Sequence, residues 1–228
     1  MRCAITNAQS ERERLRWRPD RASTRLRGIN LSIRAISDTV IRRGAVSDAA
    51  GLAAFAARTF AEAFGDYTGA DDLQAHLAAT YRPDLQTREL ADPAVITLLA
   101  LQDSRIVAYA QVRRNETPPS CVTLPAAVEL QRFYADRSVR GTSLTTRLME
   151  CALDAARKLG GQHAWLGVWE RNTRAMAFYR KAGFDEIGIT HYVVGSDRQT
   201  DRVFLASLSP SDSADPAQSL EPCRTERP

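Results

Sequence analysis

The chain has 228 residues, of which 44% are hydrophobic and 25% are charged, and these average globular values exclude a chain that is disordered throughout. Its length fits one α/β domain with tails and is too short for two large domains. The net charge of +4 is concentrated in the first 37 residues, which hold nine arginines against three acidic residues, whereas residues 38–206 carry equal numbers of basic and acidic side chains. Because a nucleic-acid-binding domain normally carries its basic patch on the fold itself, this distribution argues against specific nucleic-acid recognition.

The two ends of the chain are predicted to be disordered and to flank one folded domain at 38–206. Residues 1–37 mix Arg, Ser and Thr without an apolar period, and residues 207–228 are rich in Ser, Pro and Asp. We expect the N-terminal arm to take no part in the chemistry. A basic interaction arm, an organellar targeting peptide and translated sequence upstream of the true start stay open, although three acidic residues count against targeting.

Membrane and metal chemistry have no support in the sequence. No stretch reaches the ~18 uncharged apolar residues of a membrane-spanning helix, and the start of the chain lacks the apolar core of a secretory signal. The four cysteines lie far apart without a CxxC pair, and with three histidines they predict no metal site. We therefore expect a cytoplasmic protein with no membrane contact and no metal.

Hydrophobic periodicity predicts strands and helices in alternation through the domain. In chain order we expect a strand at 39–43, a helix from Ser47 to 63, a helix at 71–81 ending before Pro83, a hairpin of 94–101 and 106–113, a strand at 127–135, a helix at 145–159, a strand at 164–168, a helix at 172–182, and strands at 186–194 and 202–208. Helices between strands predict an α/β fold, in which a mixed sheet is covered on both faces.

The first segment that stands out is the strand, loop and helix of VELQRFYADRSVRGTSLTTRLMECALDAARKLGG. A loop that enters a helix presents free backbone N–H groups and the positive end of the helix dipole, which suit a phosphate. Arg140 lies in this loop and adds a guanidinium group for a second oxygen. Since every strand-to-helix turn has such N–H groups, a plain crossover with an exposed Arg140 is an equally good interpretation.

The second segment is WERNTRAMAFYRKAGF. Asn172 stands at the N-cap position of a helix that carries Phe178 and Tyr179 at helical spacing, and Gly183 supplies the stop. Taken alone, Tyr179 is more often a packed aromatic side chain, and Asn172 more often only a cap.

Together the two segments resemble the GNAT superfamily of acyl-CoA-dependent N-acyltransferases. The likeness spans about 38–206, and TFAEAFG followed by DDLQAHL resembles a branch that includes spermidine acetyltransferase-like proteins. The resemblance implies a GNAT-like central mixed sheet of about seven strands, in which the fourth and fifth strands splay around the acyl-CoA arm. It also implies acetyl-CoA as co-substrate and an amine as acceptor.

The resemblance further implies which residues bind the cofactor arm. The family's phosphate loop, Q/R-x-x-G-x-G/A, falls on Arg140, Gly141, Thr142, Ser143, Leu144 and Thr145. Ser143 and Thr145 stand where the family usually has glycines, so either a Cβ obstructs the pyrophosphate or the hydroxyls donate hydrogen bonds to it. Phe133 and Ala135 match the end of the strand whose backbone binds the pantetheine amides, and Asn172 matches the asparagine that contacts the pantetheine arm.

Two residues are the expected catalytic groups. Tyr179 matches the tyrosine that protonates the departing thiolate. Glu129 is expected to share one strand face with Gln131 and Phe133, and it is a candidate base, acting directly or through water. An alkylamine with a pKa near ~10 is mostly protonated at neutral pH, so a carboxylate is useful before the amine attacks the thioester directly to give a tetrahedral intermediate. A backbone N–H of the fourth strand is the expected oxyanion donor.

A different class of function stays open beside this one. Ser143 and Thr145 also fit a non-catalytic acyl-CoA-binding regulatory protein with a GNAT fold, whereas Asn172 and Tyr179 favour the enzyme. The sequence does not determine the acceptor, which can be a polyamine, an amino acid, an antibiotic or a protein N-terminus. It leaves a homodimer open as well.

Overall fold

The computed structural model describes residues 39–115, 117–194 and 197–208 of the chain. The predicted arm at 1–37 and nearly all of the predicted tail at 207–228 lie outside these residues. Ser207 is still part of the last strand, and Leu208 is buried with its N–H bonded to the carbonyl oxygen of Gln162 at 2.8 Å. The packed domain therefore extends two residues beyond the expected boundary at 206.

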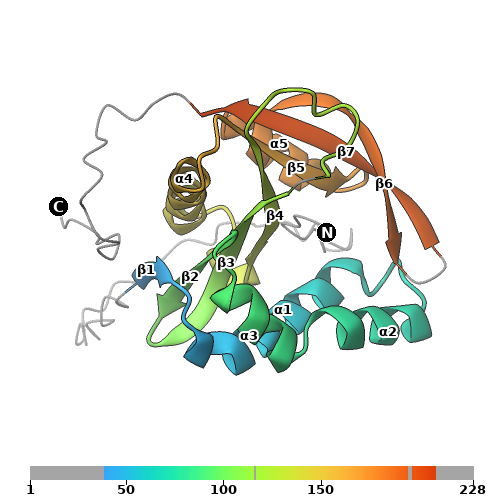
Figure 1. Cartoon of the computed structure of the whole chain (residues 1–228). Helices are drawn as coiled ribbons and strands as arrows, with labels where there is room; N and C mark the ends of the chain where they lie inside the picture. The colour runs from blue at the N-terminus through green and yellow to red at the C-terminus, as the bar shows by residue number, and fades with distance from the viewer. Residues whose placement is uncertain (1–38, 116, 195–196, 209–228) are drawn as a thin grey trace, which may run out of the picture.

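Within the described residues, seven strands form one sheet in the order β1-β2-β3-β4-β5-β7-β6 (Figure 1). The strands are β1 (Thr39–Arg43), β2 (Val95–Gln102), β3 (Arg105–Arg114), β4 (Ala127–Ala135), β5 (His163–Trp169), β6 (Asp185–Val194) and β7 (Asp197–Ser207). Neighbouring strands are antiparallel except β4 and β5, which run parallel. The predicted mixed sheet is confirmed.

Helices cover both faces of this sheet (Figure 1). The helices are α1 (Ala49–Phe64), α2 (Ala70–Thr80), α3 (Pro83–Ala91), α4 (Ser143–Lys158) and α5 (Thr173–Lys181). The first three lie on one side, while α4 and α5 lie on the other. This arrangement confirms the expected α/β layering.

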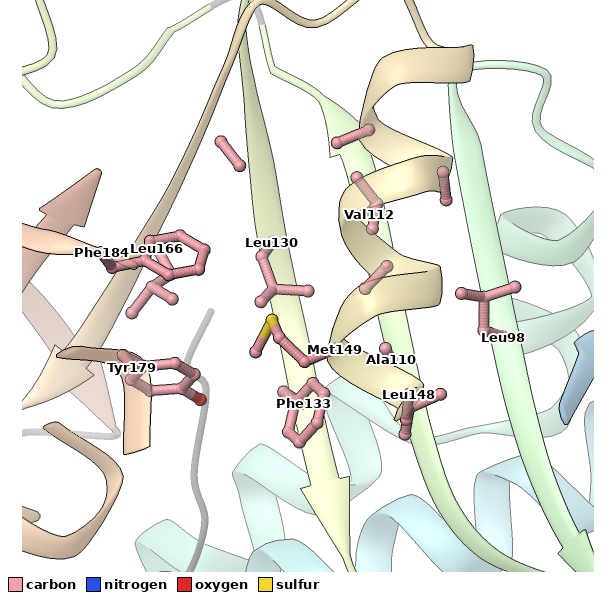
Figure 2. Close-up of a cluster of buried hydrophobic side chains, with 14 of the residues drawn as sticks. Leu98, Ala110, Val112, Leu130, Phe133, Leu148, Met149, Leu166, Tyr179 and Phe184 are labelled. Atoms are coloured by element: carbon pink, nitrogen blue, oxygen red, sulfur yellow. The ribbon is translucent and has the colours of Figure 1, made fainter. Parts of the chain in front are cut away.

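A separate hydrophobic core fills each side. On the α4 side, Leu148 and Met149 pack with Leu130 of β4 (Figure 2). On the other side, Phe60 of α1 belongs to a cluster that includes Tyr109 of β3. Each fully buried leucine side chain contributes roughly 1.5–3 kcal/mol to the stability of the fold. Because both faces of the central strands are buried, the sheet is a rigid support for the residues at its strand ends.

The turn between β2 and β3 follows the prediction closely. Asp103 and Ser104 have φ values of 50° and 64°, so both central residues of this two-residue turn are left-handed. That geometry matches the right-handed twist of the flanking strands and closes a tight hairpin.

Two predictions about the first helices are wrong in detail. The sequence predicts a helix end before Pro83, yet Pro83 is also the first residue of α3, where its missing N–H costs nothing. The helix expected from Ser47 begins instead at Ala49, after a 3₁₀ turn at Val46–Asp48. The carboxylate of Asp48 accepts the N–H of Ala45 at 2.8 Å, which closes that turn.

Candidate functional site

The parallel strands β4 and β5 separate soon after they meet. Their ladder covers three residue pairs and ends at Glu129 and Trp165. Beyond that point β4 continues to Ala135 on β3, and β5 continues to Trp169 on β7. Figure 2 shows the two strands diverging, with Leu166 and Tyr179 on one side and Leu130 and Phe133 on the other. The predicted splay of the fourth and fifth strands is confirmed.

The splay leaves one edge of β4 open. The N–H of Asp136 donates to the carbonyl oxygen of Val107 on β3 at 2.8 Å. Because antiparallel hydrogen bonding alternates along a strand, Tyr134 also bonds to β3, while Phe133 and Ala135 direct their N–H and C=O groups toward β5. These are the two residues expected to bind an extended amide chain through the backbone.

A β-bulge interrupts β4 beside the splay. The register between β3 and β4 shifts by one residue, so Gln131 is the extra residue. Leu130 and Phe133 consequently lie in the same core on the α4 side, although they are three positions apart. The expectation that Glu129, Gln131 and Phe133 share one face is wrong, because the bulge resets the alternation and places Glu129 on the face opposite Phe133.

The loop between β4 and α4 turns sharply into the helix. Gly141 has a φ of +74°, in the left-handed region that favours glycine. Thr142 is the N-cap residue, and its hydroxyl donates to the carbonyl oxygen of Val139 at 2.7 Å. The N–H groups of Ser143 and Leu144 open the helix without intrahelical acceptors, which is an arrangement that binds anions.

The two hydroxyl residues that replace glycines are placed differently. Ser143 is exposed at the first position of α4. Thr145 is 1% exposed, and its hydroxyl donates to the carbonyl oxygen of Thr142 at 2.9 Å. Only the Ser143 hydroxyl, of these two, stands at the surface of the loop.

The side chain of Arg140 is buried, so the exposed arginine expected for a plain crossover is wrong, while the choice between a phosphate loop and a plain crossover stays a prediction. Its side chain is 4% exposed, Nε donates to the carbonyl oxygen of Ala135 at 2.9 Å, and Nη2 lies 3.5 Å from a carboxylate oxygen of Glu62 on α1. Burial lowers the pKa of Arg140, the charge of Glu62 opposes this, and the charges of Arg137 and Arg174 lower the pKa further.

Arg174 is brought to the same loop from α5. Its Nη2 lies 3.6 Å from where a Cβ on Gly141 would stand. Neither Arg174 nor Arg137 was among the expected site residues. The signal that could have found Arg174 is its position in the first turn of α5, two residues after Asn172.

Asn172 and Tyr179 occupy the two ends of α5. Asn172 is the predicted N-cap, and its Oδ1 accepts the N–H of Ala175 at 3.1 Å, which leaves its Nδ2 as a donor. Tyr179 is fully buried beside the rings of Phe178 and Phe184, at centroid distances of 5.6 and 6.0 Å. Its hydroxyl points from α5 toward β4 (Figure 2).

Glu129 is buried at the point where the strands part. The residue is 4% exposed, and Oε2 accepts a hydrogen bond from Nδ2 of Asn115 at 2.8 Å. Asn115 was not expected in the site, since nothing in the sequence relates the end of β3 to this glutamate. A carboxylate at this place can accept a proton from a group that approaches on the face opposite Phe133.

Neither a metal centre nor a membrane helix is found in the part of the chain that the structure describes. Residues 39–115, 117–194 and 197–208 hold no group of three or more His, Cys, Asp or Glu side chains arranged for a metal ion. Within the same ranges, no helix has the length and apolar character needed to span a bilayer.

Comparison with known proteins shows that the chain is similar to N-acetyltransferases. A family model described as the acetyltransferase (GNAT) family matches residues 58–184. A protein named as an uncharacterized N-acetyltransferase of Mycobacterium tuberculosis is 32% identical over 163 residues, which are 72% of this chain and 99% of that protein. The N-alpha-acetyltransferase RimI of the same organism is 30% identical over 138 residues, or 59% of this chain and 77% of RimI.

Solved structures share the fold at low identity. The PaiA N-acetyltransferase of Thermoplasma acidophilum, in complex with coenzyme A, aligns with a TM-score of 0.59 and 16% identity over 74% of this chain and 98% of its own. YncA of Salmonella typhimurium, with its cofactor acetyl-CoA, aligns with a TM-score of 0.55 and 17% identity over 78% and 99% of the two chains.

Proposed function

The chain belongs to the GNAT family of acetyltransferases, and from this premise we propose that it moves the acetyl group of acetyl-CoA to a primary amine of a small molecule or a protein. The observation that carries the proposal is the short ladder between β4 and β5. The ladder ends at Glu129, leaves the open edge of Phe133 and Ala135, and has Tyr179 on the side of the diverging strand.

The phosphates of acetyl-CoA bind at the start of α4. The N–H groups of Ser143 and Leu144 donate to phosphate oxygens, and the guanidinium groups of Arg140 and Arg174 supply positive charge. The residues present suit a polyanion, because the positive charges of Arg137 and Arg174 act on Arg140 at the loop where α4 begins. The coenzyme A in PaiA and the acetyl-CoA in YncA support this choice of co-substrate.

The pantetheine arm lies along the open edge of β4. Its amides form hydrogen bonds with the β5-facing backbone groups of Phe133 and Ala135, as an additional strand does at a sheet edge. Ala135 offers mainly its N–H, because its carbonyl oxygen already accepts from Arg140. Nδ2 of Asn172 donates to the arm from the other side.

Glu129 prepares the amine for attack. An ammonium group has no lone pair, so the carboxylate accepts one of its protons, directly or through a water molecule. The neutral amine attacks the thioester carbon, and a backbone N–H of β4 stabilises the oxygen that gains charge. The bulge at Gln131 makes β4 a suitable source of this N–H, because backbone groups at a bulge do not take part in the regular ladder.

Tyr179 completes the reaction as the general acid. The carbon–sulfur bond breaks, and the phenol gives its proton to the departing thiolate. The nitrogen passes its surplus proton through water to the tyrosinate, which leaves a neutral amide and restores the phenol. Ordinary phenol and thiol groups differ by about 1.5 pKa units, which is a small barrier to the transfer. Burial keeps bulk water from supplying that proton in its place.

A panel of amines tests the proposal. Purified protein with acetyl-CoA is assayed for release of free thiol in the presence of a peptide with a free N-terminus, spermidine, single amino acids and an aminoglycoside. The peptide enters first because the RimI relative is named an N-alpha-acetyltransferase. We expect amine-dependent thiol release in the wild type and a loss of about 10²-fold in Glu129→Gln.

A non-catalytic role as an acyl-CoA-binding regulatory protein is the second candidate. The exposed Cβ atom at Ser143 favours it, since it narrows the approach of a pyrophosphate to the loop. This candidate is supported if acetyl-CoA binds in a calorimeter but no amine releases thiol above the rate of hydrolysis.

A further inference from the structure

The side chain of Asn115 is engaged at both ends. Oδ1 accepts hydrogen bonds from the N–H of Thr117 at 2.9 Å and from its hydroxyl at 3.4 Å. Nδ2 donates to Oε2 of Glu129 at 2.8 Å. Because the backbone N–H of Thr117 can only donate, the oxygen of the Asn115 amide faces Thr117 and the N–H₂ end faces the glutamate.

Among the described residues, this is the hydrogen bond that holds the carboxylate of Glu129. Arg113 stands opposite Glu129 in the register of β3, but its guanidinium lies 3.6 Å from the carboxylate of Asp92. On the other side, the register of β5 places Trp165 opposite. Oε2 is therefore engaged by Asn115, while Oε1 is left for a substrate.

We propose that Asn115 is a positioning residue for acetyl transfer, which fixes the rotamer of Glu129 so that Oε1 receives the proton of the amine. The inference rests on the proposed function, in which Glu129 is the base. Its physical ground is orientation: a catalytic group displaced by about 1 Å can lose 10²-fold in rate. A buried carboxylate held at one oxygen by a pinned amide cannot drift in that way.

A purely structural role is the competing explanation. The bond from Thr117 N–H to Oδ1 is an Asx-type turn, which shapes the start of the loop between β3 and β4. Asn115→Asp separates the two roles, because aspartate has the same shape and keeps the acceptor for Thr117. It removes only the donor and sets a carboxylate oxygen against that of Glu129.

The test measures kcat, both KM values and the melting temperature for Asn115→Asp, using the amine with the fastest thiol release in the panel. We expect kcat to fall about 10- to 100-fold, with little change in the KM for acetyl-CoA and in the melting temperature. Thr117→Val is the matched control, because it deletes only the long hydroxyl contact, and it should keep the wild-type kcat. In the Glu129→Gln background, Asn115→Asp should have almost no further effect on kcat.

A kcat for Asn115→Asp within about threefold of the wild type overturns the inference, and so does an equal loss in the Glu129→Gln background. A crystal structure of Asn115→Asp gives a readout that needs no acceptor. Glu129 should leave its wild-type rotamer, and an unmoved carboxylate contradicts the positioning role. If the wild type acetylates no amine at all, the proposed function fails, and this inference fails with it.

Discussion

The hydroxyl of Tyr179 is the proposed general acid, and removing this one group tests its role. Its ring is fully buried beside Phe184, so Tyr179→Phe keeps the packing and removes only the hydroxyl. We predict that kcat falls about 10²-fold while the affinity for acetyl-CoA and the melting temperature change little, because a general acid contributes this much to rate. Steady-state kinetics and calorimetry measure these quantities.

Phe184→Leu is the control for packing. It disturbs the same cluster without touching the hydroxyl, so it should lower the melting temperature and leave kcat nearly unchanged. If Tyr179→Phe retains kcat within about threefold while chemistry limits the rate, Tyr179 is only a core aromatic side chain.

Arg174 separates cofactor binding from chemistry. Because its guanidinium lies beside Gly141 and acts on Arg140, Arg174→Ala should weaken acetyl-CoA binding by about 5-fold at low salt, with less effect at high salt. Arg180→Ala is the matched control on the same helix, since that side chain pairs with Glu186 at 2.8 Å. Equal affinities of the Arg174 variant and the wild type in calorimetry would remove Arg174 from the phosphate site.

The site residues that could be predicted carry a signal in their local sequence, and the others do not. Asn172 was predicted because an N-cap has a local signature, and its capping bond is confirmed. Asn115 and Glu62 reach the site from distant elements, and a side chain that arrives through tertiary packing leaves no pattern in its own neighbourhood. Arg140 was predicted by position, whereas its burial depends on α1 and could not be.

Among the elements, α4 is the one whose first turn differs from the family's glycine-rich loop, because Ser143 and Thr145 stand where glycines are usual. Ser143→Gly removes an exposed Cβ at the first helical position, where the proposed function places a phosphate. We predict modestly tighter acetyl-CoA binding, by ~1 kcal/mol or less. Thr145→Gly should act mainly on stability, because it deletes a buried side chain and its bond to Thr142 and costs roughly 0.3–0.5 kcal/mol in helix propensity as well.

Calorimetry and thermal melting of the two single variants and the double variant resolve these effects. Weaker binding by Ser143→Gly means that the hydroxyl is itself a ligand of the phosphate. Ser143→Ala is the informative control, since it removes the hydroxyl and keeps the Cβ.

The elements β4 and α3 show what local sequence patterns could not predict. β4 was placed correctly at 127–135, but strict alternation along it put Glu129 and Phe133 on one face. A single inserted residue reverses alternation, and nothing in the strand's composition marks Gln131 as that residue. α3 was missed because proline was taken as a helix stop, although it also starts helices when it occupies the first position.

A buried ion pair ties α3 to β4. Arg132 is 1% exposed, and it binds both oxygens of Glu89, at 2.6 and 3.0 Å. We predict that Glu89→Gln costs about 3 kcal/mol, because it leaves an uncompensated buried charge, and lowers the melting temperature by about 6–12 °C. The double variant Glu89→Leu with Arg132→Met should recover much of this loss, and no recovery would mean that the pair is irreplaceable for packing.

At the scale of the whole molecule, the site lies between two parts of one sheet. β1 to β4 carry Glu129 and the open edge, whereas β5, with the β6–β7 hairpin and α5, carries Asn172 and Tyr179. Only three residue pairs join these parts through β4 and β5. The splay was expected from the resemblance of the two motifs, because no periodicity within a strand records where its pairing ends.

The basic arm at 1–37 lies outside the described residues. Residues 39–115, 117–194 and 197–208 form the seven-stranded sheet and the two cores described above, and the arm has no apolar period to bury. Deletion of 1–37 should therefore leave kcat, the KM for acetyl-CoA and the melting temperature nearly unchanged. Since it removes a charge of +6, nonspecific binding to nucleic acid that weakens with salt should disappear with it, which filter binding at two salt concentrations measures. A large loss of activity at saturating substrates would instead show that the functional domain begins before residue 38.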